Sequence, residues 1–163
     1  MPKDSAPTRS AILAAALQAL KRGGFDAFSI DAVARRAGVA KGLVLYHFES
    51  RRRLLRLCAD EIAAERARRL TRALASGPGA AGIDAVWKEL MRQDEDGTAR
   101  AWLSLCAAGI VAPATGNPGF EERARQAILD GCTAALAARA PATELRDAYN
   151  ALWLALLDVG GRD

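Results

Sequence analysis

The side chains best suited to bind another molecule noncovalently lie close together, between residues 40 and 53. This segment supplies cations, rings that form hydrogen bonds and an apolar tip, at Lys41, Leu43, Tyr46, His47 and Arg51. Cations and polar rings bind phosphate oxygens, and an apolar tip contacts a thymine methyl group. We therefore expect a base contact from Leu43 and phosphate contacts from the other four.

Two short helices joined at a glycine are expected to position these side chains. Apolar residues recur at helical spacing in the first helix, at Ile30, Val33, Ala34 and Ala37. Gly38 follows, where a tight turn needs a residue that tolerates positive φ. In the second helix Val44 and Phe48 lie four residues apart and face the same small core, so the other side chains face outward. Gly42 allows close approach of the backbone, and the whole is a helix-turn-helix pattern.

Further cations flank this pattern. Ser50 is placed to cap the next helix, and Arg51, Arg52 and Arg53 follow in its first turn, where unpaired N–H groups favour an anion. Arg9 is expected to add a contact from the flank. Residues 1–56 hold 11 Lys and Arg against 4 Asp and Glu, whereas the remainder holds 12 against 15. This division predicts that nucleic acid meets only the first third of the chain, although a solvated basic surface is the alternative.

Residues 28–54, FSIDAVARRAGVAKGLVLYHFESRRRL, resemble the DNA-binding domain of the tetracycline-repressor (TetR) family of bacterial transcriptional regulators. The family pattern runs IA-x-x-AGVSKG-x-LYxxF-x-SK, and this chain matches it at Val33-Ala34, Ala37-Gly38-Val39, Lys41-Gly42, Phe48 and Ser50-Arg51. With the upstream TRSAILAAALQAL, the resemblance covers about residues 8–57. The chain departs at Leu45, where the family often has a phosphate-contacting tyrosine, and at Leu43, where it has a small or hydroxyl residue.

The resemblance implies an all-α protein, with a three-helix DNA-binding domain over residues 1–56 and a helical effector-binding and dimerisation domain over residues 57–163. The composition agrees, because 51% hydrophobic but only 6% aromatic residues favour helices over strands. The implied function is a sequence-specific repressor that binds double-stranded operator DNA as a homodimer and is released by a small-molecule effector. The alternatives are an all-helical protein-interaction module and a nonspecific DNA-binding protein without effector control.

The last two predicted helices carry apolar stripes at i, i+3/i+4 spacing. The stripes include Ile128, Cys132, Leu136, Tyr149, Leu152, Trp153 and Leu156. In the TetR family the last two long helices pair with their copies to form the dimer, so the resemblance implies a dimer interface at these residues. The alternative is that both stripes form intramolecular core.

The middle helices offer apolar side chains for a ligand pocket, which the family usually encloses there. The candidates are Trp87, Met91, Trp102, Leu105 and Cys106. Such a pocket would suit a lipophilic effector. Plain core packing is the alternative reading of the same residues.

Residues that catalyse reactions are scarce in this chain. The only histidine is His47, so triad and histidine–metal arrangements lack a base or ligand elsewhere, and no enzyme activity, cofactor or metal is expected. The carboxylates of Asp94, Glu95 and Asp96 are expected to form a solvated cluster. The three cysteines lie in apolar stretches and are expected to be buried thiols of a cytoplasmic protein with no membrane segment.

Glycine and proline divide the rest of the chain into helices. The predicted helices span Thr8–Arg22, Arg51–Ala75, Ile83–Gln93, Thr98–Val111, Pro118–Arg139 and Thr143–Val159. The helix over Arg51–Ala75 is long enough to join two domains, and its charged middle, EIAAERARRLTR, predicts a solvated central stretch.

Overall fold

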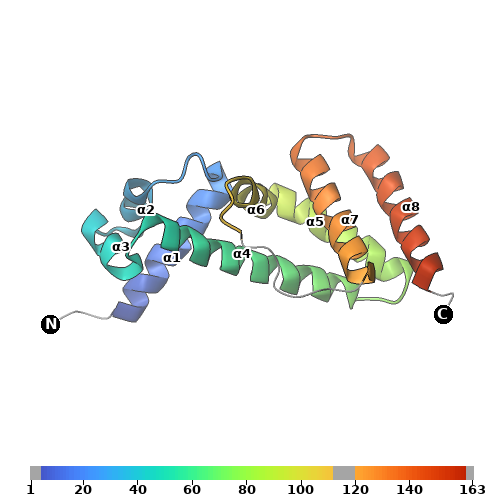
Figure 1. The fold of residues 1–163 in the computed structure, drawn as a ribbon, viewed down its shortest axis with the longest axis horizontal. Helices are drawn as coiled ribbons and strands as arrows, with labels where there is room; N and C mark the ends of the chain where they lie inside the picture. Colours follow the sequence, from blue (N-terminus) through green and yellow to red (C-terminus); the bar gives the residue numbers. More distant parts are fainter. Residues whose placement is uncertain (1–4, 112–119, 161–163) are drawn as a thin grey trace. The chain divides into compact units, whose positions relative to one another are not determined.

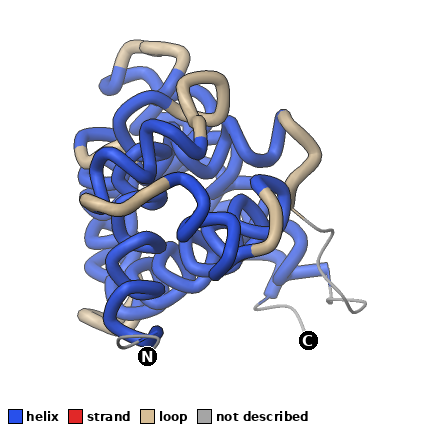
Figure 2. Tube along the Cα trace, turned by 90° about the vertical axis from the view of Figure 1, so that its left-hand side faces the viewer, coloured by secondary structure: helices blue, strands red, loops and turns tan. Residues whose placement is uncertain are grey.

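Eight helices and no strand make up the part of the chain that the computed structural model describes, residues 5–111 and 120–160 (Figures 1 and 2). They are α1 (Ser5–Gly23), α2 (Ile30–Ala37), α3 (Lys41–Phe48), α4 (Arg51–Leu74), α5 (Ala80–Glu95), α6 (Thr98–Ala107), α7 (Phe120–Ala137) and α8 (Ala142–Gly160). The all-α prediction is therefore confirmed. Pro118 and Gly119, at the start of one predicted helix, lie outside the described residues.

The α6 helix ends earlier than the predicted Val111 because a glycine turn stops it. Gly109 adopts a φ of 63°, which places it in the left-handed region. The Ile110 N–H donates to the Leu105 carbonyl oxygen over 3.0 Å, and this bond closes the helix end.

The described residues form two compact units. Unit 1 comprises residues 5–66 and 100–111, and unit 2 comprises residues 67–99 and 120–160. The helices α4 and α6 therefore contribute residues to both units. The packing boundary within α4 lies ten residues beyond residue 56, where the sequence predicts the functional boundary.

The core of unit 1 forms where α1, α2, α3 and the start of α4 meet. Its fully buried side chains include Ile12, Leu20, Val33, Val44, Phe48 and Leu54. Leu105 of α6 belongs to the same core. This packing fixes which side of α3 is buried and which is exposed.

The core of unit 2 is separate and lies among α5, α7 and α8. Its buried members are Ile83, Val86, Leu90, Ile128, Cys132, Leu136, Tyr149 and Trp153. α7 and α8 lie side by side (Figure 1). The Tyr149 hydroxyl donates to the Ile83 carbonyl oxygen over 2.7 Å, which ties α8 to the start of α5.

The charged middle of α4 is solvated only in part, because Glu61, Arg68 and Arg72 are exposed but Arg66 is buried. In unit 1, Arg66 is only 4% exposed and its guanidinium lies 4.9 Å from the centre of the Trp102 ring. The neighbouring Glu65 pairs with Lys21 over 3.0 Å. Long charged side chains bury their apolar stems and pair their charged groups, which a count of charges along the sequence does not reveal.

No helix in the described ranges combines the length and apolar character that a membrane span needs.

Candidate nucleic-acid interface

The turn between α2 and α3 is held by interactions at both ends of α2. The Ser29 hydroxyl oxygen accepts a hydrogen bond from the Ala32 N–H over 3.1 Å and caps the helix start. At the other end Gly38 has a φ of 66°, and the Val39 N–H donates to the Ala34 carbonyl oxygen over 3.0 Å. This closing bond sets the direction in which α3 leaves the turn.

The outward face of α3 is the one that the sequence predicts. Val44 and Phe48 are buried, while Tyr46 is 73% exposed and Leu43 and Leu45 are each exposed over more than a third of their surface. The Gly42 Cα has open space around it. α3 therefore presents apolar tips and a phenol to the solvent without an obstructing side chain at Gly42.

The N-terminus of α3 offers unfilled hydrogen-bond donors beside a cation. Ala40 is the capping residue and has no side-chain oxygen, so the first N–H groups have no side-chain cap. Lys41 forms an ion pair with Asp31 over 3.0 Å, and more than half of each side chain is exposed. Such exposed pairs contribute about 0–1 kcal/mol, so a phosphate can compete with Asp31 for this lysine.

Arg51 is held by its own domain. Its guanidinium donates to the Phe28 carbonyl oxygen over 3.2 Å and lies 4.8 Å from the centre of the Phe25 ring. It also lies 5.6 Å from the Phe28 ring. The side chain predicted to bind phosphate therefore packs α4 against the segment that precedes α2.

The other two arginines at the start of α4, Arg52 and Arg53, differ in the interactions that their side chains form. The Ser50 hydroxyl accepts from the Arg53 N–H over 3.1 Å, which confirms the predicted cap, and the Arg53 guanidinium pairs with Glu49 over 2.8 Å. Arg52 is exposed, and within the described ranges its side chain forms no ion pair or hydrogen bond. The sequence pattern predicts that Arg52 lies in the first turn of α4 but predicts no contact for it.

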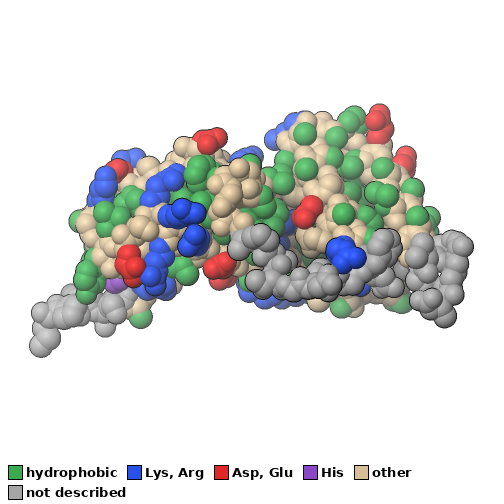
Figure 3. Space-filling model, viewed as in Figure 1, with side chains coloured by type: hydrophobic (Ala, Val, Ile, Leu, Met, Phe, Trp, Pro, Cys, Tyr) green, Lys and Arg blue, Asp and Glu red, His purple; other side chains and the backbone are tan. Residues whose placement is uncertain are grey.

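Arg9 and His47 both lie near the Phe48 ring. The Arg9 guanidinium is 5.0 Å from the ring centre, and the ring centres of His47 and Phe48 are 6.5 Å apart. His47 is half-buried and meets the Tyr46 ring edge-on, with ring centres 5.4 Å apart. Figure 3 shows Lys and Arg side chains on the visible face of unit 1, with a few carboxylates among them.

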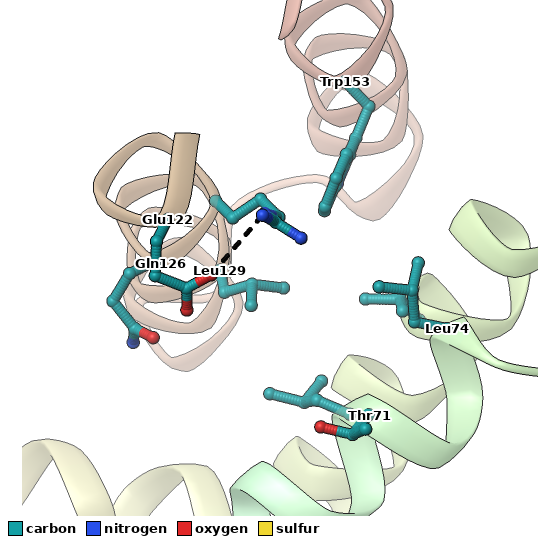
Figure 4. Close-up of a pocket in the computed structure, with 9 residues that line it drawn as sticks. Thr71, Leu74, Glu122, Gln126, Leu129 and Trp153 are labelled. Carbon is teal, nitrogen blue, oxygen red and sulfur yellow. Dashed lines mark ion pairs between the residues drawn. The ribbon is translucent and has the colours of Figure 1, made fainter. Parts of the chain in front are cut away.

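The five predicted pocket residues are divided between the two units. Trp87 and Met91 pack against the core of unit 2, whereas Trp102 and Leu105 belong to the core of unit 1. Cys106 is exposed in unit 1. Unit 2 instead contains a cavity of about 140 Å³, lined by Leu70, Thr71, Leu74, Val86, Glu122, Arg125, Gln126, Leu129 and Trp153 (Figure 4).

Most of the predicted dimer residues lie inside unit 2. The buried ones are Ile128, Cys132, Leu136, Tyr149 and Trp153. Leu156 is half-buried, and Leu152 is 50% exposed. The exposed surface of these two helices consists largely of small residues, including Ala127, Gly131, Ala134, Ala148, Ala151 and Ala155.

The cysteines and acidic residues do not form a reactive cluster. Burial raises the pKa of the Cys58 thiol to about 12 and also raises that of Cys132, so both are poor nucleophiles. The prediction that Cys106 is buried is wrong, because it lies at the exposed end of α6. In the described part of the chain, no group of His, Cys, Asp and Glu side chains is arranged to hold a metal ion.

Residues 12–58 match the family model of bacterial regulatory proteins, tetR family. This segment contains most of α1 and all of α2, the turn and α3, together with the start of α4. No curated protein matches the chain in sequence.

Solved structures share the fold over longer stretches. The multidrug binding protein EbrR, in complex with imidazole, is 23% identical with a TM-score of 0.66, covering 91% of this chain and 90% of EbrR. The TetR-like regulator LfrR from Mycobacterium smegmatis, in complex with proflavine, is 21% identical with a TM-score of 0.56, covering 92% of this chain and 95% of LfrR. A TetR family transcription regulator from Marinobacter aquaeolei VT8 is 19% identical with a TM-score of 0.57, covering 80% of this chain and 66% of that protein. Residues 12–58 are therefore similar in sequence to the tetR family of bacterial regulatory proteins, and the chain shares the helical fold of these solved structures.

Proposed function

We propose that this protein is a sequence-specific DNA-binding regulator, and specifically a repressor that a small molecule releases from its operator. The observation that carries the proposal is the outward face of α3, because a mixture of apolar tips, a phenol and a cation beside Gly42 is suited to the major groove. This face lies within residues 12–58, the part that matches the family model.

Each exposed residue of the interface has a distinct proposed role. Leu43 contacts a thymine methyl group, and Gly42 permits close approach of the backbone. Lys41 and Tyr46 bind phosphate oxygens at the groove edge. His47 and Arg9 are proposed phosphate contacts from the Phe48 side, and Arg52 joins them because its side chain is exposed.

Arg51 has a different proposed role from the other cations. Its guanidinium is engaged by Phe25 and Phe28, so it acts on DNA binding by holding α4 against the helix-turn-helix. For Arg51 to contact a phosphate directly, its guanidinium would have to bind the phosphate in addition to the Phe28 carbonyl oxygen and the two rings.

The second half of the chain is proposed to serve dimerisation and control. A symmetric dimer presents two copies of α3 about one DNA turn apart, roughly 34–36 Å, to a palindromic site. The exposed small residues and Leu152 on α7 and α8 are the proposed contact surface. The α4 helix, which contributes residues to both units, is the proposed lever between effector and DNA.

The effector site is proposed to be the cavity of unit 2. The similar proteins EbrR and LfrR were solved with imidazole and proflavine respectively, which supports a small-molecule site in a protein of this fold. The cavity is lined by both apolar and polar side chains, so it offers packing surface and hydrogen-bonding groups to a ligand.

The proposed function is tested by selecting DNA fragments from the genome of origin with the purified protein and footprinting the bound sites. We expect an imperfect palindrome that binds at least about a thousandfold more tightly than a scrambled duplex of the same composition at physiological salt. Equal affinity for both duplexes would establish a nonspecific binder, and no affinity for either would favour the protein-interaction module. Both results contradict the proposal.

A further inference from the structure

Exposed apolar side chains are concentrated on α3. Among the large hydrophobic side chains that are exposed in the described part of the chain, Leu43, Leu45 and Tyr46 all belong to this helix of 8 residues. Leu43 is 37% exposed and Leu45 is 38% exposed, and neither is part of the core of unit 1. An apolar group that covers these leucines removes their surface from water, which stabilises the contact.

The two leucines flank the part of α3 that can approach another molecule most closely. At 3.6 residues per turn, Gly42 and Tyr46 lie opposite the buried side of the helix. Leu43 lies on one side of the line through these two residues, and Leu45 lies on the other. The Gly42 Cα has open space around it, so no side chain at this position keeps the backbone away from a duplex.

The side chains of α3 are poorly suited to distinguish bases by hydrogen bonds. Its sequence, KGLVLYHF, contains no Arg for guanine and no Asn or Gln for adenine. The ammonium group of Lys41 pairs with Asp31. The Tyr46 hydroxyl and the neutral His47 ring can each donate or accept, so they fit thymine O4 and cytosine N4–H2 alike. Apolar contact is therefore the means of base discrimination that remains to this helix.

The apolar group that the major groove presents is the methyl group on C5 of a pyrimidine. Thymine carries this group and cytosine does not. In 5-methylcytosine the same group occupies the same position. A leucine that packs against this methyl group therefore distinguishes thymine from cytosine but does not distinguish thymine from 5-methylcytosine.

We propose that α3 recognises C5-methylated pyrimidines, either thymine or 5-methylcytosine, through Leu43 and Leu45. Methylation of a cytosine at a contacted position then strengthens binding. This inference rests on the proposed function, because it concerns the same face of α3. It adds Leu45 as a second base-reading residue and makes DNA binding sensitive to cytosine methylation.

The test uses the full chain and duplexes that differ by single methyl groups. Each thymine of the selected operator is replaced in turn by uracil, which keeps the hydrogen-bonding edge and lacks the methyl group. At a contacted thymine we expect uracil to weaken binding about three- to fourfold, which is the effect of burying one methyl group. Equal affinity for thymine and uracil at every position overturns the inference.

The same positions are then tested with cytosine. The contacted T·A pair is replaced by C·G and by 5-methylcytosine·G, and both affinities are measured by fluorescence anisotropy. We expect 5-methylcytosine to bind more tightly than cytosine by the same factor of about three to four, because the same methyl group is buried. Equal affinity for the two cytosine duplexes overturns the inference.

Three matched leucine variants locate the contact. Leu43→Ala and Leu45→Ala should each reduce the ratio of thymine affinity to uracil affinity toward one, at the position that the leucine contacts. Leu74→Ala makes the same change at a side chain of unit 2 that is also 37% exposed, and should leave every ratio unchanged. Ratios that persist in both α3 variants would show that the methyl group acts through the shape of the duplex, and would overturn the inference.

The outcomes separate this inference from the proposed function. The uracil comparison needs no variant, so it decides the inference even if a leucine variant fails to fold. A selected operator whose affinity depends on no methyl group removes the methyl contact and leaves the sequence-specific regulator in place. A selection that yields no preferred duplex overturns both.

Discussion

The Arg51 guanidinium is engaged by two phenylalanine rings and a backbone carbonyl oxygen. We predict that Arg51→Ala lowers the free energy of unfolding by about 1–2 kcal/mol, since a cation–π contact and a charged hydrogen bond are lost together. Chemical denaturation measures this loss. The matched variant Arg52→Ala removes the same charge from the next position and should change stability by less than about 0.5 kcal/mol while weakening DNA binding. Equal stability losses in the two variants would contradict the assigned roles.

The exposed pair between Asp31 and Lys41 restrains a cation that the proposal assigns to phosphate. We predict that Asp31→Asn raises DNA affinity by about two- to fivefold, because an exposed pair of this kind contributes at most about 1 kcal/mol. Fluorescence anisotropy with operator DNA measures the change. Asp26→Asn, at an exposed position before α2, makes the same change of charge away from Lys41 and should have the smaller effect. A larger effect at Asp26 would argue against Lys41 as a contact.

At the scale of single residues, the sequence predicts which side chains are exposed to solvent better than it predicts which residues each side chain contacts. Helical spacing from Val44 and Phe48 correctly places Tyr46 and Leu43 outside. The engagement of Arg51 by the Phe28 carbonyl oxygen joins groups 23 residues apart, and no local spacing rule anticipates it. The sequence offers only the aromatic pair Phe25 and Phe28 as a signal.

The turn between α5 and α6 is fastened to α4 within unit 2. The Asp96 carboxylate accepts hydrogen bonds from the Thr98 N–H over 2.9 Å and from the Arg69 guanidinium over 2.7 Å. Burial by itself raises the pKa of Asp96, but the hydrogen bonds from Thr98 and Arg69 outweigh it and hold the pKa below its ordinary value. Asp96 is exposed, as a solvated carboxylate is expected to be, but it also takes part in a tertiary interaction that the sequence does not predict.

The lowered pKa of Asp96 sets the sign of a stability change with pH. The carboxylate stabilises the folded state above the unfolded pKa of about 4, and this contribution is lost as the pH falls through the folded-state pKa. We predict that Asp96→Asn destabilises unit 2 at neutral pH by less than about 1 kcal/mol, since the side chain is well exposed, and reduces the loss of stability between about pH 6 and pH 3. Thermal melts across this range test it, with the exposed Asp147→Asn as control. A pH dependence identical to that of the natural chain would refute this role.

At the scale of helices, the sequence predicts that each helix exists. It predicts where a helix begins or ends only at positions that carry a capping residue or a turn residue. Ser50 before α4 and Gly38 after α2 give local signals that the structure confirms. The burial of Arg66 depends on the Trp102 ring of a different helix, so the composition of α4 alone suggested a solvated stretch.

Two separate cores organise the described part of the molecule. The sequence predicts two domains but assigns Trp102 and Leu105 to the same pocket as Trp87. The reason is that apolar spacing shows which face of a helix is buried but does not show which other helix packs against that face. The cavity of unit 2 was missed for the same reason, since four helices contribute to its lining. The apolar stripes on α7 and α8 are likewise mostly intramolecular core, which is the alternative interpretation of their spacing.

The exposed face of α7 and α8 is where a second copy is proposed to bind. Hydrophobic side chains are prominent on the visible surface of these helices (Figure 3). We predict that Leu152→Glu converts the dimer to a monomer in sedimentation experiments, because a buried unpaired charge opposes association. Leu154→Glu places the same charge roughly opposite on the helix, at a side chain that is 66% exposed, and should leave the dimer intact. A monomeric natural chain at micromolar concentration, or loss of the dimer only with Leu154→Glu, would contradict this surface.

The central claim, that the α3 face binds DNA, is tested most directly by the salt dependence of binding to the selected operator. Affinities of the natural chain, Lys41→Ala and Arg72→Ala are measured by anisotropy over a series of salt concentrations. Arg72 is an exposed cation of unit 2 and serves as the matched loss of charge. We predict a steep decrease in affinity with salt, a slope reduced by about 0.9 in Lys41→Ala, and an unchanged slope in Arg72→Ala. A flat salt response, or the same slope for Lys41→Ala as for the natural chain, would contradict the claim.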